Sequence, residues 1–432
     1  MLEMAAKQGE NRKNGANENL LHRITQNMLY YPKIVSAEAS AMKTLIELYD
    51  PQPFQNVLST ETFRPERTVF LCPPEVAGSG QRKRCLQEYL THRGVRSELL
   101  FRPVSLLDAA AITAALKEVI RAYPDCALDI GGGSDAALFA AGTVCVHSPI
   151  PVFTYSRRKN TYFNIQNAAF AENLPCGLRL SIEDCFRMAG AATMNGRVDN
   201  NVLRQYAALI PDMFNLYLRF RREWTGIVSY IQCISQPGKS QAPSLNVSGA
   251  YVQKGARGRK ISAPEKALRE MQRIGLLNGL DIRPGETVTF AFRDLQVRAW
   301  LRDVGSILEL YTYQCCLDTA LFQDVRTSVV VDWDGDTQAR KVTNEIDVMA
   351  ARGVIPLFIS CKTCAVKTEA LNELSILRDR FGSEMARAAI VTAERANSAV
   401  RSRAQELNIR VIDLEDLRKD RLQARLSGIA AN

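Results

Sequence analysis

Near the C-terminus, two short stretches, NEIDVM and LFISCK, place polar side chains at alternate positions of otherwise apolar strands. Because successive side chains of a strand point to opposite faces, Glu345 and Asp347 share one face of the first stretch. By the same alternation, Ser360 and Lys362 share one face of the second. Polar groups that interrupt an apolar face are costly unless they pair or take part in chemistry. These side chains are therefore the first candidates for a catalytic site.

The segment AARG between the two stretches predicts a hairpin, which would bring Glu345, Asp347 and Lys362 together. Carboxylates beside a lysine suit phosphodiester hydrolysis. The carboxylates can hold Mg²⁺ or Mn²⁺, while the lysine steadies the attacking water or the pentacovalent phosphorus. A buried structural ion pair between Asp347 and Lys362 would produce the same pattern. Strand geometry alone supports both interpretations.

The elements that would position this hairpin follow from the hydrophobic pattern. The pattern predicts a helix over 301–323, strands over 328–335, 342–353 and 354–362, a helix over 368–381, a strand over 388–393, a helix over 395–407, a strand over 409–414 and a further helix at the end. The region is therefore of the α/β class, with the candidate hairpin inside its sheet.

The hairpin residues resemble a known nuclease motif. Asp347 followed by SCK looks like the P-D-(D/E)-x-K motif, and NEIDV with FISCKT is similar to CARF-domain nucleases, the CRISPR ancillary nucleases activated by cyclic oligoadenylate from type III complexes. The resemblance implies a catalytic Asp347 and Lys362, with Glu309 from the preceding helix and assistance from Glu345. It also implies that Asp347, Glu309 and the backbone carbonyl of Cys361 are ligands of Mg²⁺ or Mn²⁺.

Two positions depart from the family pattern. Ser360 stands at the second acidic position of the motif, and a hydroxyl is a poorer ligand for a hard cation than a carboxylate. Asp135 stands where several family members have lysine or another residue favourable to phosphate, and a carboxylate there would repel a polyanion. The first departure leaves catalysis open, and the second leaves open the identity of the activating ligand.

In the N-terminal half, from residue 67 to about residue 182, short β-rich runs alternate with helical stretches, which predicts a parallel, Rossmann-like sheet with helices on both faces. Its third predicted strand runs into DIGGGSDAALFAAG, at the strand end where such sheets bind ligands. Glycines there allow close backbone approach, and the next helix favours an anion at its first N–H groups. A tight strand-to-helix turn is the alternative. The resemblance implies a homodimer that binds cyclic oligoadenylate through the loop residues Gly131, Gly132, Gly133, Ser134 and Asp135.

These features predict four regions. We expect a polar, disordered tail over 1–41, a CARF-like ligand-sensing domain over 42–195, a helical linker with a winged-helix-like connector over 196–300, and a restriction-endonuclease-like PD-(D/E)xK domain over 301–432.

Within the connector, the pattern predicts one long helix over 209–234 and a flexible linker over 235–262. Ser262 is a plausible cap of the helix that follows, and the strand after that helix suggests a winged-helix element. The basic cluster KGARGRK in the linker either contacts phosphate or is a solvated loop. A catalytically inactive nucleotide sensor that binds nucleic acid through this connector is therefore a second hypothesis beside the nuclease.

Composition limits the remaining possibilities. The chain has 55 Lys and Arg against 46 Asp and Glu, a net charge of +9 that fits a nucleic-acid partner without requiring one. Its 11 cysteines lie mostly in apolar runs, which favours free thiols over disulfides. Neither a signal peptide nor an uncharged run of 18 apolar residues is present, so we expect a cytoplasmic protein with no membrane partner. The G-x-G-x-x-G fingerprint is missing, which argues against a dinucleotide-dependent oxidoreductase.

Overall fold

The computed structural model of the chain describes residues 42–194, 200–236, 243–255, 258–333, 335, 343–382 and 384–431, so the predicted tail over 1–41 lies outside the described part. The chain divides into two compact units. The first extends to Leu178 apart from residues 84–89, and the second comprises those residues and the chain from Arg179 onward. In the described residues no helix combines the length and the apolar character that a bilayer crossing requires. All 11 cysteines are free thiols.

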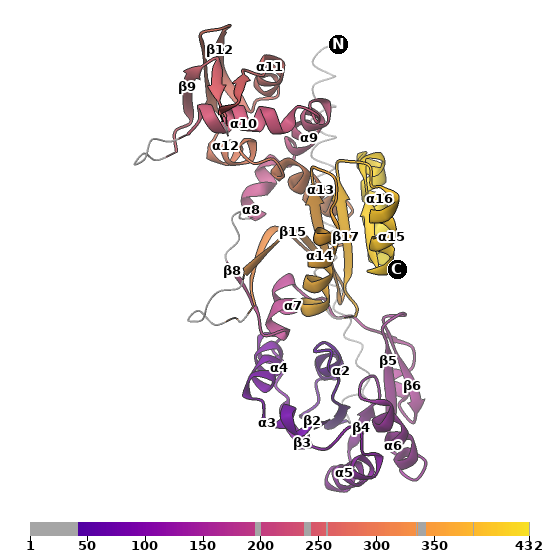
Figure 1. Ribbon diagram of the computed structural model, residues 1–432. Coiled ribbons are helices and arrows are strands. Elements are labelled where there is room, and N and C mark those ends of the chain that lie inside the picture. The colour runs from indigo at the N-terminus through magenta and orange to yellow at the C-terminus, as the bar shows by residue number, and fades with distance from the viewer. Residues whose placement is uncertain are drawn as a thin grey trace, which may run out of the picture. The chain divides into compact units, whose positions relative to one another are not determined.

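The first unit is built on a seven-stranded sheet with the order β3-β2-β1-β4-β5-β6-β7 (Figure 1). The strands are β1 (Thr44–Leu48), β2 (Arg67–Cys72), β3 (Glu98–Pro103), β4 (Cys126–Asp129), β5 (Val152–Ser156), β6 (Thr161–Gln166) and β7 (Leu174–Pro175). The pairs from β3 to β5 are parallel, and β6 and β7 add on antiparallel. The predicted Rossmann-like core is therefore present, with an antiparallel edge.

The central strand of this sheet, β1, is missing from the sequence prediction. Its five residues are all buried, because helices cover both faces of the sheet. The helices are α2 (Gln55–Phe63), α3 (Pro74–Gly78), α4 (Gly80–His92), α5 (Ala109–Ala122) and α6 (Asp135–Cys145). α5 and α6 share a core with Ile46 and Leu48, while α2 contacts the opposite face through Ser59. Because β1 precedes the predicted strands, the glycine loop follows the fourth strand and not the third.

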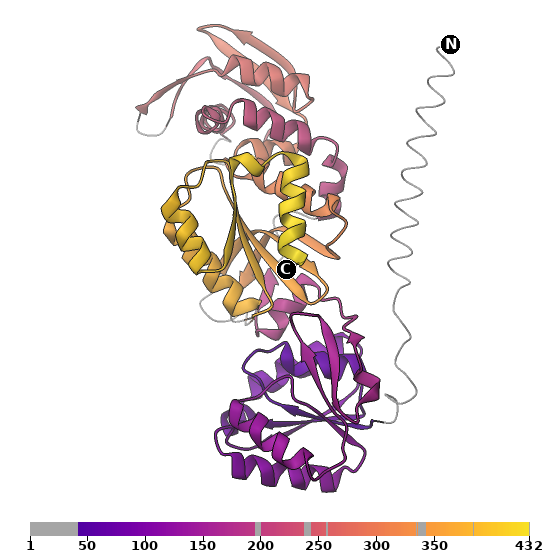
Figure 2. The ribbon, with the colours of Figure 1, turned by 90° about the vertical axis from the view of Figure 1, so that its right-hand side faces the viewer.

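The second unit contains a six-stranded sheet with the order β18-β17-β16-β15-β14-β8. Its strands are β8 (Ala192–Met194), β14 (Asp324–Asp332), β15 (Thr343–Arg352), β16 (Ile355–Lys362), β17 (Arg387–Thr392) and β18 (Ile409–Ile412). Its helices are α7 (Ile182–Met188), α13 (Ser306–Asp318), α14 (Thr368–Phe381), α15 (Ser398–Glu406) and α16 (Lys419–Ala431). Figure 2 shows the sheet between α14 and α15 on one side and α16 on the other. The strongly periodic C-terminal elements thus match the predicted series.

The connector carries a three-stranded antiparallel sheet, β12-β13-β9, and a separate two-stranded pair, β10-β11. The strands are β9 (Asn246–Ala250), β10 (Val252–Lys254), β11 (Lys260–Ser262), β12 (Leu277–Arg283) and β13 (Thr287–Phe292). The helices are α8 (Asn200–Leu203), α9 (Ile210–Arg219), α10 (Trp224–Ile234), α11 (Glu265–Arg273) and α12 (Leu295–Leu301). The order of helix, hairpin and additional strand agrees with the winged-helix-like prediction.

Three local predictions in the connector were wrong. The long helix is broken into α9 and α10, where the guanidinium of Arg221 donates to the carbonyl of Ala393 and pairs with Glu394 at 3.2 Å. The described part of the predicted flexible linker contains three strands, because β9 pairs with β13 and β10 pairs with β11. The N-cap of α11 is Pro264 and not Ser262, which ends β11.

The structure also moves the first domain boundary from residue 195 to Leu178. β8 pairs antiparallel with β14 at the edge of the C-terminal sheet, and Ile182 and Phe186 of α7 are buried in the core of that sheet. This pairing joins segments more than 130 residues apart, so local sequence patterns carry no sign of it. The predicted boundary between residues 195 and 196 lies outside the described residues.

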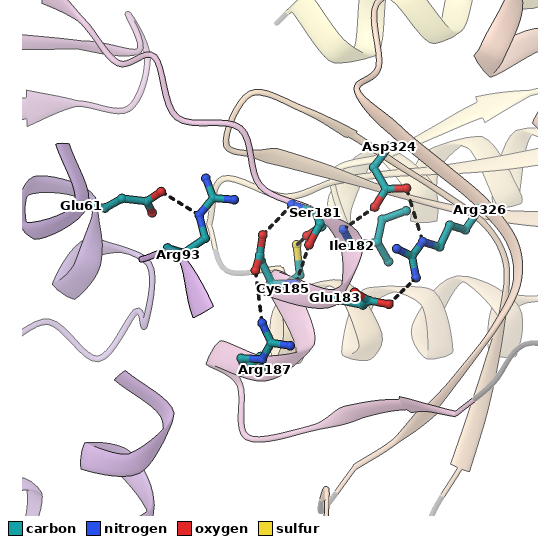
Figure 3. Close-up of polar contacts among 10 residues, drawn as sticks. Glu61, Arg93, Ser181, Ile182, Glu183, Cys185, Arg187, Asp324 and Arg326 are labelled. Atoms are coloured by element: carbon teal, nitrogen blue, oxygen red, sulfur yellow. Dashed lines mark hydrogen bonds and ion pairs between the residues drawn. The ribbon is translucent and has the colours of Figure 1, made fainter. Parts of the chain in front are cut away.

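Polar contacts fix α7 on β14 (Figure 3). Ser181 and Asp184 form a capping box at the start of α7. The backbone N–H of Ile182 donates to Asp324 at 2.9 Å, and Arg326 donates to Glu183 at 2.8 Å. The chain therefore enters the C-terminal sheet within a few residues of the unit boundary.

Candidate functional site

The predicted hairpin exists, and its two strands separate at the candidate residues. The antiparallel ladder of β15 and β16 runs from Arg352–Ile355 to Val348–Ile359 and ends there. β16 continues beside β17 as far as the Lys362–Thr392 pair. Asp347 therefore lies at the point where the two strands part, with its side chain facing the last residues of β16.

Three donors converge on one oxygen of Asp347. Oδ2 accepts the backbone N–H of Cys361 at 2.6 Å and the hydroxyl of Ser360 at 3.0 Å, and the Lys362 ammonium lies at 3.5 Å. The side chains of Asp347 and Lys362 are 18% and 35% exposed, so the ion pair is open to solvent and not buried in the sheet. The arrangement holds a carboxylate and an ammonium at an accessible position, as phosphodiester chemistry requires.

Glu309 approaches this group from the first turn of α13, which packs against β15 and β16. Burial, together with the nearby negative charges of Asp347, Asp303 and Glu345, raises the pKa of Glu309 to about 8, while Lys362 opposes the shift. The side chain of Glu345 is exposed, at the edge of the group. The structure thus gathers the predicted carboxylates around one lysine.

Backbone details allow Glu309 to take this position. A Cβ at Gly305 would lie 2.7 Å from Glu309 Oε1, so a larger residue would displace the carboxyl. Asp303 accepts from the backbone N–H groups of Gly305 and Ser306 just before α13 and so fixes the start of this helix. The thiol of Cys361 donates to Thr312 of α13 at 3.6 Å and fixes β16 against this helix. An aspartate just before a helix is a sequence signal for the helix start, whereas nothing in the sequence pointed to Thr312.

Within the described residues no three His, Cys, Asp or Glu side chains form a cluster that could hold a metal. Mg²⁺ commonly takes one or two carboxylates and completes its shell with water and substrate phosphates. Asp347 and Glu309 are the two carboxylates available here, and burial raises the pKa of the Cys361 thiol well above its usual range, which disfavours a thiolate.

In the first unit, the glycine loop is held between β4 and α6. Gly131 donates its N–H to Asp129 at 2.6 Å and accepts from the Gln55 side chain at 2.8 Å. Ser134 caps α6 by accepting the N–H of Ala137 at 3.2 Å, and its hydroxyl donates to the carbonyl of Leu106. The loop is therefore fixed on both sides before any ligand binds.

The end of β1 explains why this loop consists of glycines. A Cβ at Gly132 would lie 2.8 Å from the carbonyl oxygen of Leu48, and one at Gly133 would lie 2.8 Å from the Cβ of Leu48. Gly133 also has a φ of +94°, which side chains rarely adopt. Asp135 is exposed in the first turn of α6, where the helix dipole favours a carboxylate. Packing alone thus accounts for the glycines, as the turn interpretation proposes. The loop backbone also lies at the end of strand β4.

Beside the loop, two buried carboxyl groups face each other on neighbouring strands. Glu47 of β1 pairs in register with Asp129 of β4, and their exposures are 2% and 3%. Burial raises the pKa of Asp129 to about 6, although hydrogen bonds from Ser59 and Gly131 oppose the shift. Burial and the charge of Asp129 raise the pKa of Glu47 well above its usual range. Among the described residues, Glu47 Oε1 has no hydrogen-bond partner. Sequence reasoning did not find this pair, because β1 was missed.

Comparisons with known proteins show which family and which folds this chain resembles. Residues 296–427 match the family of Card1-like endonuclease domains. Protein VC1899 from Vibrio cholerae shares 19% identity, with a TM-score of 0.70 over 90% of this chain and 99% of its own. Can2 from Sulfobacillus thermosulfidooxidans, solved in complex with cyclic tetra-adenylate, shares 15% identity, with a TM-score of 0.67 over 91% of this chain and 99% of its own. At these identities the comparisons show a common fold. No curated protein matches the sequence.

The buried acid pair predicts a specific pH dependence of stability. The folded state holds protons on Glu47 and Asp129 that the unfolded chain releases above a pH of about 4, so the free energy of unfolding falls as the pH rises through about 6. We expect Glu47→Gln to raise the free energy of unfolding by about 1–2 kcal/mol at pH 7, and by less at pH 4. Denaturant unfolding of the first unit at both pH values measures this.

Glu98→Gln is the matched control for this variant. Glu98 is a β3 carboxylate that is 63% exposed and lies 3.9 Å from Arg67, so its replacement should change stability little at either pH. A Glu47→Gln protein that is less stable than the parent at pH 7 would contradict the interpretation, because it would mean that the charged carboxylate stabilises the fold.

Proposed function

We propose that this chain, which has a Card1-like endonuclease domain at its C-terminus, is a ligand-gated, metal-dependent nuclease that cleaves phosphodiester bonds of DNA, RNA or both. The observation that carries the proposal is the convergence of Ser360, Cys361 and Lys362 on the Asp347 carboxylate where β15 and β16 separate. The placement of Glu309 next to this carboxylate supports it, since a catalytic carboxylate pair needs this proximity.

In the proposed site, Asp347, Glu309 and the backbone carbonyl of Cys361 would hold Mg²⁺ or Mn²⁺, which polarises the scissile phosphate and lowers the pKa of a bound water. Lys362, which reaches Asp347 in this structure, would donate to the attacking water or to a phosphate oxygen. Ser360 keeps Asp347 oriented through its hydroxyl. Glu345, exposed at the edge, would help to orient the water.

The proposed activator is a cyclic oligoadenylate or a related nucleotide. Can2, which shares this fold, was solved with cyclic tetra-adenylate. We propose that Gly131, Gly132, Gly133, Ser134 and Asp135 contact the ligand, chiefly through their backbone groups. The exposed carboxylate of Asp135 disfavours a phosphate directly beside it, so it would contact a base or a ribose hydroxyl.

We further propose that two copies pair through the first unit. The outer face of α6 exposes Leu138, Phe139 and Val146, which are 37%, 72% and 78% exposed, and Leu107 is 87% exposed. Exposed apolar side chains at helical spacing on one face are typical of a protein interface. Because α6 begins at the glycine loop, a pairing there would bring the loops of both copies near one ligand.

The first test of the nuclease is metal-dependent cleavage. The purified protein is incubated with Mn²⁺ and plasmid DNA, single-stranded DNA or single-stranded RNA, with and without cyclic tetra-adenylate. We expect cleavage that requires both metal and activator, and a rate for Asp347→Asn at least about 100-fold lower, since the loss of such a contact costs about 3 kcal/mol of transition-state stabilisation.

Asp318→Asn serves as the control because it removes a carboxylate from the same helix as Glu309 but away from the site, where Asp318 pairs with Lys419 at 2.8 Å. Its cleavage rate should match that of the parent. Cleavage by Asp347→Asn at the parental rate, or cleavage unaffected by a chelator, would refute the proposal.

A second candidate function is a catalytically inactive nucleotide sensor that binds nucleic acid. The observation that favours it is Ser360, whose hydroxyl occupies the position of the motif acid and donates to Asp347 instead of binding a cation. In this case the parent protein cleaves nothing, and Ser360→Glu gains Mn²⁺-dependent cleavage. For the active nuclease we expect Ser360→Ala to lower the cleavage rate roughly tenfold, because Asp347 loses one hydrogen bond to its charged carboxylate, worth about 1.5 kcal/mol.

The dimer is tested by Phe139→Asp in sedimentation-equilibrium measurements. A buried aromatic at an interface typically contributes about 2 kcal/mol, so the dissociation constant of the dimer should rise at least about 30-fold. Ile376→Asp replaces an apolar side chain of α14 that is 56% exposed, and this control should leave the dissociation constant unchanged. Monomers in the parent protein at micromolar concentration would contradict the proposed pairing.

A further inference from the structure

The two-stranded pair β10-β11 forms a short ribbon with one exposed and one packed face, which we call the basic ribbon (Val252–Lys254 and Lys260–Ser262). Its register pairs Val252 with Ser262, Gln253 with Ile261, and Lys254 with Lys260. The outer pairs are exposed, whereas Gln253 and Ile261 are half-buried. The alternation therefore directs both lysines to the solvent on one face.

The packed face fixes the basic ribbon to the connector. Ile261 packs against the large core that continues into the C-terminal sheet. The thiol of Cys233 in α10 donates to the carbonyl of Lys254 at 3.7 Å, and the Gln253 side chain donates to Ala250 at 2.8 Å. Tyr251, at the base, donates to Glu265 at 2.9 Å. The exposed face is thus held in a defined orientation.

The exposed face carries positive charge that the described residues leave uncompensated. Lys254 and Lys260 lie directly opposite each other, an arrangement of like charges that destabilises a strand pair. Neither lysine has an acidic partner in the described parts of the chain, nor does the exposed Arg259. Residues 256 and 257 of the same basic cluster lie outside those parts.

The neighbouring helix α11 has the opposite character. Arg269 lies 3.7 Å from Glu265, and Glu270 accepts from Arg273 at 2.7 Å and forms an ion pair with Arg219 at 3.2 Å. Its arginines are paired with glutamates of the same unit, so α11 offers less free charge to a polyanion than its basic residues alone suggest. Among the described strand pairs of the connector, two like charges face each other only at Lys254 and Lys260, which indicates a function for that charge.

We propose that the basic ribbon binds the phosphate backbone of duplex DNA and holds the substrate for the nuclease. The major groove of B-DNA admits a two-stranded ribbon, whereas the deep, narrow major groove of A-form RNA does not. Lysines that contact phosphates bind without sequence preference. The ribbon and the catalytic residues belong to one unit, in which Phe214 of α9 stacks on Tyr311 of α13 at 3.6 Å, two residues from Glu309. The inference rests on the proposed nuclease function.

The test compares the full-length parent with the Lys254→Gln, Lys260→Gln double variant. Binding to a 30-base-pair DNA duplex is measured at several salt concentrations without divalent metal, so that no cleavage occurs. We expect the affinity to fall roughly tenfold and the slope of log K against log salt to decrease in magnitude by about 1.8, as for the loss of two phosphate contacts. The variant should fold at least as stably as the parent, because it relieves the repulsion of the two lysines.

The Arg269→Gln, Arg273→Gln variant of α11 is the matched control and should keep the parental affinity and slope. An unchanged affinity of the lysine variant overturns the proposal. An equal loss of affinity for duplex RNA overturns the assignment to DNA. If the parent protein never cleaves but the lysine variant loses duplex DNA binding, the ribbon is supported and the nuclease is refuted. If the lysine variant cleaves and binds DNA like the parent, the ribbon alone is refuted.

Discussion

The C-terminal site depends on the contacts of the Asp347 carboxylate with the end of β16. One of its oxygens accepts from Ser360 and from the backbone of Cys361, and it lies near the Lys362 ammonium at the place where the ladder between β15 and β16 has ended. Without the carboxylate, the backbone N–H of Cys361 would lose its partner, and the lysine would have no fixed counter-ion beside it. The separation of the strands gives access to the site, and the carboxylate keeps the separated ends in register.

The sequence was sufficient for the C-terminal elements and for part of the site. Strand alternation correctly grouped Asp347 with Lys362, because a period of two is a local property of the chain. The placement of Glu309 depended on the family resemblance, since no pattern within a helix tells which strand it will cover. Likewise, β8 and the boundary at Leu178 result from pairing over a long sequence separation, which local periodicity does not encode.

The errors in the first unit and in the connector have a common cause. β1 is short and fully buried, so it shows no alternation, and the acid Glu47 interrupts its apolar run. The polar composition of residues 246–262 suggested a linker, although strand pairing satisfies the backbone there regardless of side-chain polarity. In both cases tertiary context decided the structure. The glycine loop was found, but the reason for its glycines, the approach of Leu48, required β1.

The discontinuity of the C-terminal sheet has a consequence for how the endonuclease region could be isolated. β8 and α7 precede the connector in the chain, yet β8 pairs with β14, and α7 packs against Val331 of the same sheet and against Phe381 of α14. A fragment that begins at residue 301 would lack both, leaving the outer backbone groups of β14 unpaired and an apolar face open to water. Such an edge is a template for aggregation. The endonuclease is therefore one folding module encoded in two separate stretches, with the connector as an insertion between them.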